Sequence, residues 1–278
     1  MTIAPGFQFS QSSLQDFVDC PRRFFLRYVR GLQWPAPESE PLRVYEEHLR
    51  CGAQLHHLIH QHLVGIPAAL LSETIEEDER VFVWWGRFLN SGLAGLPAQR
   101  HPEIALTAPL AEAGGRRIVA KYDLIAIEPG ERAVIVDWKT SLGRPRRDRL
   151  AARLQTIIYP WLLVRAGASL NGGAPIAPEA VQMIYWFAEQ PNHPEVFAYS
   201  AEQFARDDAY LRRLAADLLA RTADDFPLTE DARLCRYCTF RTLCERGEHA
   251  GPFDEIEDWF DDDVSVTFDL DQIAEVAF

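Results

Sequence analysis

Lysine is nearly absent from this chain of 278 residues. Of its 28 basic residues only Lys121 and Lys139 are lysines, so arginine is the general cation. Long apolar runs are absent too, and none approaches the roughly 20 residues that a membrane-spanning helix needs. The N-terminus lacks a basic segment followed by an apolar one, which argues against a secretion signal. We therefore expect a cytoplasmic protein.

Cysteine is also sparse, and its five residues make an odd number. In a reducing compartment, grouped cysteines bind metal more often than they form disulfides. With 47% hydrophobic residues, the chain is an ordinary globular one that can bury a sizeable core as one elaborated domain.

The net charge of −13 is unusual for a protein that binds nucleic acid, but it is unevenly placed. Segment 251–278 holds ten acidic residues and no lysine or arginine, so the rest of the chain is near neutral. Positive charge in that rest gathers in two clusters that can hold phosphate, although a solvated helix face explains either cluster equally well. The clusters are Arg22, Arg23, Arg27 and Arg30, and Arg144, Arg146, Arg147, Arg149 and Arg153.

The period of the apolar residues predicts a mainly helical first third followed by a sheet. Helices are predicted at 10–30, 42–64 and 72–90, the last behind a capping-box pattern at Ser72, with a loop at Pro35, Pro37 and Pro41. Consecutive antiparallel strands are predicted at 103–110, 117–127 and 132–138, followed by a helix at 148–166, strands at 180–189 and 195–199, and a helix at 201–222. This order favours an α/β fold with a mixed central sheet.

The sharpest local pattern is the apolar run Val134-Ile135-Val136, which ends in Asp137-Trp138-Lys139. The period of a strand places Asp137 and Lys139 on one face. The carboxylate can ligate a hard cation while the ammonium reaches the same phosphate or the attacking water. In a chain so poor in lysine, catalysis explains Lys139 better than solubility does, although a surface ion pair at a strand end is the alternative.

Further polar residues surround this pattern in the sequence. Asp123 lies among residues of the preceding strand that otherwise look buried, and with Asp137 it could bind one divalent ion. His56 could add a nitrogen ligand, although its i, i+4 neighbour His60 leaves a zinc pair or plain packing open. Gln155 and Tyr159 share a helix face after the arginine-rich loop and can present an amide and a phenol.

In order and spacing, Gly52 to His56, Asp123, Asp137 to Lys139 and Gln155 to Tyr159 resemble the RecB-like branch of the PD-(D/E)XK nuclease superfamily. The resemblance covers about residues 8–247, including an N-terminal helix from Ser10 to Tyr28. It implies a restriction-endonuclease-like core, in which a mixed central β-sheet is flanked by helices. One departure is Lys121, which stands where the family often has glycine.

The resemblance also implies a role for each of these residues. His56, Asp123 and Asp137 would ligate Mg²⁺ or Mn²⁺, Lys139 would act at the water or the phosphate, and Gln155 and Tyr159 would position the substrate. The arginines at 144–153 would grip neighbouring phosphates without reading bases.

Three cysteines form the compact pattern Cys235-x2-Cys238-x5-Cys244, and Cys20 is the obvious fourth ligand. Four thiolates can hold zinc or an iron–sulfur cluster, and spacing does not separate the two. The chain is similar to the iron–sulfur subgroup of these nucleases, which includes AddB-type helicase–nuclease subunits and CRISPR adaptation nucleases. That likeness implies a [4Fe-4S] cluster and leaves Cys51 as a small buried residue.

We therefore expect a helical region at 1–100 that contributes Cys20 and His56, a nuclease core at 101–225, an iron–sulfur segment at 226–250 and an acidic tail at 251–278. The expected function is metal-dependent hydrolysis of single-stranded DNA or duplex ends with little sequence specificity, as an exonuclease in DNA repair or recombination beside a helicase. A CRISPR spacer-processing nuclease, a catalytically silent iron–sulfur DNA-binding scaffold and an RNA-directed enzyme are the alternatives. The tail mixes its acids with apolar residues, so we expect it to dock on the protein's own DNA groove or on a partner.

Overall fold

The computed structural model of the protein describes most of the chain from residue 3 to residue 247. Outside the described part are residues 1, 2, 5, 33–39, 76–78, 92–94, 111, 112, 142, 144, 224, 237 and 248–278. The predictions for the acidic tail, for Arg144 and for the loop at Pro35 and Pro37 fall on these residues. In the described part, no helix is long and apolar enough to cross a bilayer.

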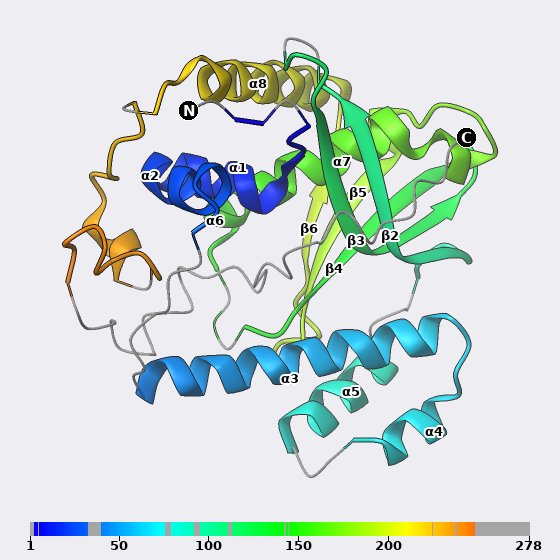
Figure 1. The fold of residues 1–278 in the computed structure, drawn as a ribbon. Helices are drawn as coiled ribbons and strands as arrows, with labels where there is room; N and C mark the ends of the chain where they lie inside the picture. The colour runs from blue at the N-terminus through cyan, green and yellow to red at the C-terminus, as the bar shows by residue number, and fades with distance from the viewer. Residues whose placement is uncertain are drawn as a thin grey trace.

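A six-stranded mixed sheet forms the centre of the fold (Figure 1). Its strands are β1 (Phe9–Ser10), β2 (Gln99–Pro109), β3 (Arg117–Glu128), β4 (Arg132–Lys139), β5 (Val181–Phe187) and β6 (Glu195–Ala198). β2, β3 and β4 are consecutive antiparallel strands, β4 and β5 run parallel, and β6 is antiparallel to β5. The predicted α/β class and mixed sheet are confirmed.

Helices cover both faces of this sheet. They are α1 (Gln11–Asp19), α2 (Pro21–Phe24), the π-helical η1 (Phe25–Val29), α3 (Glu40–Leu63), α4 (Ala68–Glu73), α5 (Glu79–Ser91), α6 (Arg147–Ala152), α7 (Leu154–Ala166) and α8 (Ala201–Ala220). Short 3-10 turns are η2 (Gly167–Asn171), η3 (Pro178–Ala180) and η4 (Ala232–Cys235). Most predicted helices are present, but several of their boundaries differ from the prediction.

The predicted helix at 10–30 is divided at Cys20, whose backbone is extended because a residue before proline avoids the helical region. The predicted helix at 148–166 is divided at Arg153, and the first amide of α7, on Leu154, is capped by the Gln15 side chain. Pro41 lies in the first turn of α3, where its missing N–H is tolerated, so its assignment to a loop was wrong.

The predicted capping box at Ser72 was also wrong. Ser72 lies inside α4, where its hydroxyl donates to the Ala68 carbonyl and accepts from the Trp85 indole N–H. The side chain is therefore used to join α4 to α5, which begins only at Glu79.

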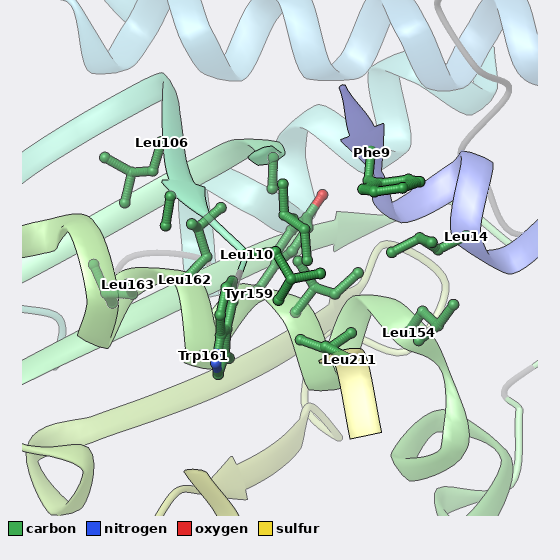
Figure 2. Close-up of a cluster of buried hydrophobic side chains, with 14 of the residues drawn as sticks. Phe9, Leu14, Leu106, Leu110, Leu154, Tyr159, Trp161, Leu162, Leu163 and Leu211 are labelled. Atoms are coloured by element: carbon green, nitrogen blue, oxygen red, sulfur yellow. The ribbon is translucent and has the colours of Figure 1, made fainter. Parts of the chain in front are cut away.

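The two faces of the sheet have separate cores. On one face the large core joins α1, α7 and α8 to the sheet, and Figure 2 shows Leu14, Trp161 and Leu211 from these helices together with Phe9 of β1 and Leu106 of β2 in this core. On the other face a smaller core joins α3, α4 and α5 to Val136, Trp138 and other strand residues. The ends of β3 and β4 therefore lie between helices of both layers.

After α8 the chain returns to its N-terminal helices (Figure 1). The Arg22 amide donates to the Pro227 carbonyl, and the Phe226 ring stacks on Phe24 and Phe25 at centroid distances of 6.2 Å and 5.0 Å. This packing brings the cysteine-bearing segment 227–247 beside α2, which follows Cys20.

Candidate active site

The sheet opens into a fork beside β3. β2 pairs with nearly all of β3 along one edge, whereas the other edge is shared by β4, which pairs with 124–128, and β1, which pairs with Ile118 and Val119. In the described strand pairs, residues 120–123 have no strand on that second edge. On its other edge, β4 pairs with β5 from Ala133 to Lys139. The predicted acidic residues, Asp123 on β3 and Asp137 on β4, lie just beyond the last pair of these strands, Leu124 and Val136. We call this place the fork.

The Asp123 carboxylate on β3 contacts both β4 and α3. One oxygen of its carboxylate accepts a hydrogen bond of 2.9 Å from the backbone N–H of Trp138, and the other lies 3.4 Å from Nδ1 of His56. Burial alone would raise the pKa of Asp123, but the His56 imidazole and the Trp138 amide hold it below its ordinary value. Asp123 is therefore an anion in the folded protein at neutral pH.

Asp137 and Lys139 lie side by side in the buried centre of the site, as the period of a strand predicts. Nζ of Lys139 is 3.0 Å from one Asp137 carboxylate oxygen, and Nε2 of Gln155 donates to the other at 2.6 Å. The Lys139 ammonium also lies over the ring of Tyr185, 5.7 Å from its centroid. Oε1 of Gln155 is buried and accepts no hydrogen bond in the described part of the chain, so it can accept one from a water or a ligand.

His56 reaches the fork from α3. Burial lowers the pKa of this imidazole, but the Asp123 and Asp137 carboxylates outweigh that effect and raise it to about 9. In the absence of metal His56 is therefore a cation at neutral pH. Since a metal-binding histidine must be neutral, a metal at this place would displace a proton.

The sequence interpretation included Gly52 but missed its contact. A Cβ added to Gly52 would lie 2.7 Å from Oγ1 of Thr140, the residue after Lys139. Glycine at this position therefore lets α3 approach the end of β4 closely, one helical turn before His56. The spacing from Gly52 to His56 was visible in the sequence, whereas the partner on the strand was not.

Tyr159 is largely buried, and its predicted role at the substrate stays a prediction. Its side chain is a member of the large core (Figure 2), with its ring centroid 4.7 Å from that of Tyr122, and its carbonyl accepts a hydrogen bond from the Tyr122 hydroxyl. Tyr159 thus supports the strand residue that precedes Asp123.

The side chains of the site have the chemistry that a hard divalent cation requires, namely carboxylate oxygens beside an imidazole. In the described part of the chain, no group of three or more His, Cys, Asp or Glu side chains is arranged closely enough to hold a metal ion. At the fork, cationic side chains contact both carboxylates: His56 contacts Asp123 and Lys139 contacts Asp137.

Cys20, Cys235, Cys238 and Cys244 gather where segment 227–247 meets α2. Burial raises the pKa of the last three thiols, and the nearby Cys20 sulfur raises each of them further. Cys51 lies apart, buried in the smaller core, where it accepts a hydrogen bond from Arg80. The described cysteines form no group close enough to hold a metal ion, so the predicted set of four ligands stays a prediction.

The sequence profile of the PD-(D/E)XK nuclease superfamily matches residues 8–245. The chain belongs to the PD-(D/E)XK nuclease superfamily. Nucleases of this superfamily typically use divalent ions such as Mg²⁺ and act on DNA. The match includes the fork and all four grouped cysteines.

Solved structures show weaker likenesses to this PD-(D/E)XK nuclease. The crystal structure of the protein SSO0001 matches with 19% identity and a TM-score of 0.41, covering 85% of each chain. That of a candidate exonuclease from Eubacterium rectale matches with 11% identity and a TM-score of 0.48, covering 76% of this chain and 80% of the other. Among curated proteins, no sequence matches.

Proposed function

We propose that this nuclease is a metal-dependent deoxyribonuclease that hydrolyses single-stranded DNA or duplex ends with little sequence specificity, in DNA repair or recombination. The observation that carries the proposal is the meeting of Asp123, Asp137 and Lys139 at the fork, with Gln155 behind them. Two carboxylates and one ammonium on neighbouring strand ends are what metal-assisted phosphodiester hydrolysis needs.

In this proposal Asp123, Asp137 and His56 would hold Mg²⁺ or Mn²⁺, which supplies a deprotonated water and neutralises charge that develops on the phosphate. Asp137 would exchange part of its contact with Lys139 for the metal. Lys139 would then be free to donate to the phosphate or to the attacking water. Gln155 would hold the Asp137 carboxylate in the required orientation.

Substrate contacts outside the fork would come from the arginines near α6. Arg146 and Arg147 have more than half of their side chains exposed and form ion pairs with Asp148 and Glu195 respectively, and Arg147 also donates to the Val196 carbonyl. Such arginines can exchange a carboxylate for a phosphate, which favours affinity for the DNA backbone and gives no base specificity.

We further propose that Cys20, Cys235, Cys238 and Cys244 hold a [4Fe-4S] cluster. What supports this is that Cys20, from the N-terminal end, lies near enough to Cys235, Cys238 and Cys244 to raise the pKa of each thiol, and that segment 227–247 has few buried residues of its own. When bound, the cluster would bridge those two ends of the chain and would hold the sulfurs as thiolates.

The test is anaerobic purification of the full chain, its visible spectrum, and assays on labelled single- and double-stranded DNA and RNA with Mg²⁺ or Mn²⁺. We expect a brown protein that cuts DNA only when a divalent ion is added. Failure of the wild-type protein to cut any DNA would contradict the nuclease proposal. A colourless protein with one equivalent of zinc would contradict the iron–sulfur proposal and leave the set of four ligands intact.

A further inference from the structure

The two lysines of this chain have related positions. Lys139 follows Asp137 by two residues on β4, and Lys121 precedes Asp123 by two residues on β3. Lys139 belongs to the buried centre of the fork, whereas 37% of the Lys121 side chain is exposed. The proposed mechanism gives no role to Lys121.

Lys121 lies on the same side of the sheet as the active-site contacts of Asp123. Its neighbours Ala120 and Tyr122 are buried in the large core, so the alternation along β3 directs Lys121 to the opposite face. That face is the one from which α3 brings His56 to Asp123. On the neighbouring strand, the residue opposite Lys121 is Ala105, and Ala105 is exposed. Lys121 thus lies on an open strip of sheet that leads away from the fork.

One partner of Lys121 is Glu103, with which it forms an ion pair. The ladder between β2 and β3 pairs Pro102 with Leu124 and Ile104 with Tyr122, so Glu103 lies between them and across from Asp123. Its φ of 54° is uncommon for a residue other than glycine, and such backbone outliers concentrate at functional sites. Glu103 thus keeps the Lys121 ammonium beside the candidate active site.

This ion pair is suited to exchange. Glu103 is 22% exposed and Lys121 37%, and ion pairs in contact with water contribute little net stability. A phosphate oxygen can therefore replace the Glu103 carboxylate at Lys121 without a large loss. Two residues along a strand span about 6.6 Å, a length similar to the separation of neighbouring phosphates in an extended DNA strand.

We propose that Lys121 binds the phosphate next to the one that is cleaved, and that Glu103 occupies the lysine until DNA displaces it. The proposal rests on the proposed nuclease function and adds the path of the substrate strand, along the open strip of β3. Lys121 is then a substrate-binding residue, and Glu103 is a competitor that lowers the affinity for DNA.

The test measures binding of a labelled 20-nucleotide oligothymidylate at several salt concentrations, without divalent ions, to Asp137→Asn protein so that the DNA stays intact. In that background, Lys121→Gln should reduce the slope of log affinity against log salt by about 0.7, the value for one single-strand phosphate contact. At about 0.15 M salt this corresponds to a loss of roughly fourfold in affinity. Lys121→Arg should retain the slope, and Glu103→Gln should raise the affinity.

The proposal predicts that Lys121→Gln weakens DNA binding and that Glu103→Gln strengthens it. If the ion pair were only structural, both variants would weaken binding. The matched control is Arg132→Gln, which breaks the exposed Arg132–Glu128 pair at the other end of the hairpin and should leave the slope unchanged. An unchanged slope in Lys121→Gln, or weaker binding in Glu103→Gln, would overturn the proposal. These outcomes are independent of whether the wild-type protein cuts DNA, which alone tests the proposed function.

A chemical variant tests the assigned phosphate. Once wild-type cleavage is mapped, a neutral methylphosphonate is placed at each phosphate flanking the cut. One of the two replacements should weaken binding by the protein with Lys121 and have no further effect on Lys121→Gln. If both replacements weaken the two proteins equally, Lys121 contacts neither phosphate.

Discussion

The fork of the sheet and the cysteine-bearing segment 227–247 are stabilised in different ways. At the fork, polar side chains stand at the ends of strands whose other residues, such as Val136 and Trp138, are buried in the smaller core. In segment 227–247 the buried residues are few, among them Cys235, Phe240 and Arg241. From this difference we expect the fork to persist without a metal, because the sheet holds it, and the cysteine segment to depend on the proposed cluster.

The largest expected effect comes from variants that remove the charged groups of the fork and leave the surrounding strands in place. Asp137→Asn or Lys139→Ala should reduce DNA cleavage by about 10³-fold or more, which corresponds to about 4 kcal/mol. Rates with Mg²⁺ and Mn²⁺ measure this. Asp137→Asn with Lys139→Met removes both buried charges and should be as inactive as the single variants. Its melting temperature should equal or exceed that of Asp137→Asn, which leaves one charge uncompensated. Near wild-type turnover in a folded single variant would show that the site is misassigned.

The next effect addresses the cysteine segment. Cys238→Ser should remove the visible absorbance, lower the free energy of unfolding by several kcal/mol and expose segment 227–247 to protease. Cys51→Ser is the control that keeps the colour, because Cys51 lies in the smaller core. If Cys238→Ser kept its protease resistance, the segment would be held by packing alone and the contrast with the fork would disappear.

A smaller effect tests how closely α3 must approach the fork. Gly52→Ala should destabilise the protein by about 1–3 kcal/mol, because the new methyl group meets the Thr140 hydroxyl at 2.7 Å. Gly86→Ala in α5 meets nothing within 4 Å and should instead stabilise by about 0.5–1 kcal/mol through helix propensity. Adding Thr140→Ala, which removes the hydroxyl, should restore the stability of the Gly52→Ala variant. Equal melting temperatures for the two glycine variants would mean that the contact between residue 52 and Thr140 does not set how closely α3 can approach β4.

The smallest effect concerns the ion pair that joins α5 to the end of β5. Glu189 accepts from Trp84 and Arg87, and the preceding residue, Ala188, donates its amide to the Lys139 carbonyl. Burial raises the pKa of Glu189, but these hydrogen bonds and Arg87 lower it below its ordinary 4.5. A depressed acid pKa stabilises the fold above pH 4.5, and this contribution is lost as the pH falls through the folded-state pKa.

Glu189→Gln should therefore cost about 1 kcal/mol at pH 7 and less as the pH is lowered below about 4.5. Denaturant titrations of both proteins at several pH values measure the difference. A constant difference over the whole range would assign it to packing and exclude the charge of Glu189.

The sequence was informative where a pattern is local. Alternation along residues 132–139 placed Asp137 and Lys139 together, because the period of a strand is independent of the rest of the fold. It failed where distant residues decide, as at Ser72, which bonds Trp85, and at Gln15, which caps α7. The contact between Gly52 and Thr140 and the depth of Tyr159 likewise depend on how helices pack on the sheet.

The open stretch on β3 between β1 and β4 has a consequence for association between molecules. Exposed strand edges invite pairing with other chains, and proteins usually cover or blunt them. Here the stretch is only four residues long, 120–123, and neighbouring strands bound it on both sides. A strand from another molecule would have to enter between β1 and β4, and the Asp123 carboxylate already caps the Trp138 amide beside it. In the described part of the chain, the fold can thus keep a short edge beside its chemistry that no strand covers, without presenting it as a template for aggregation.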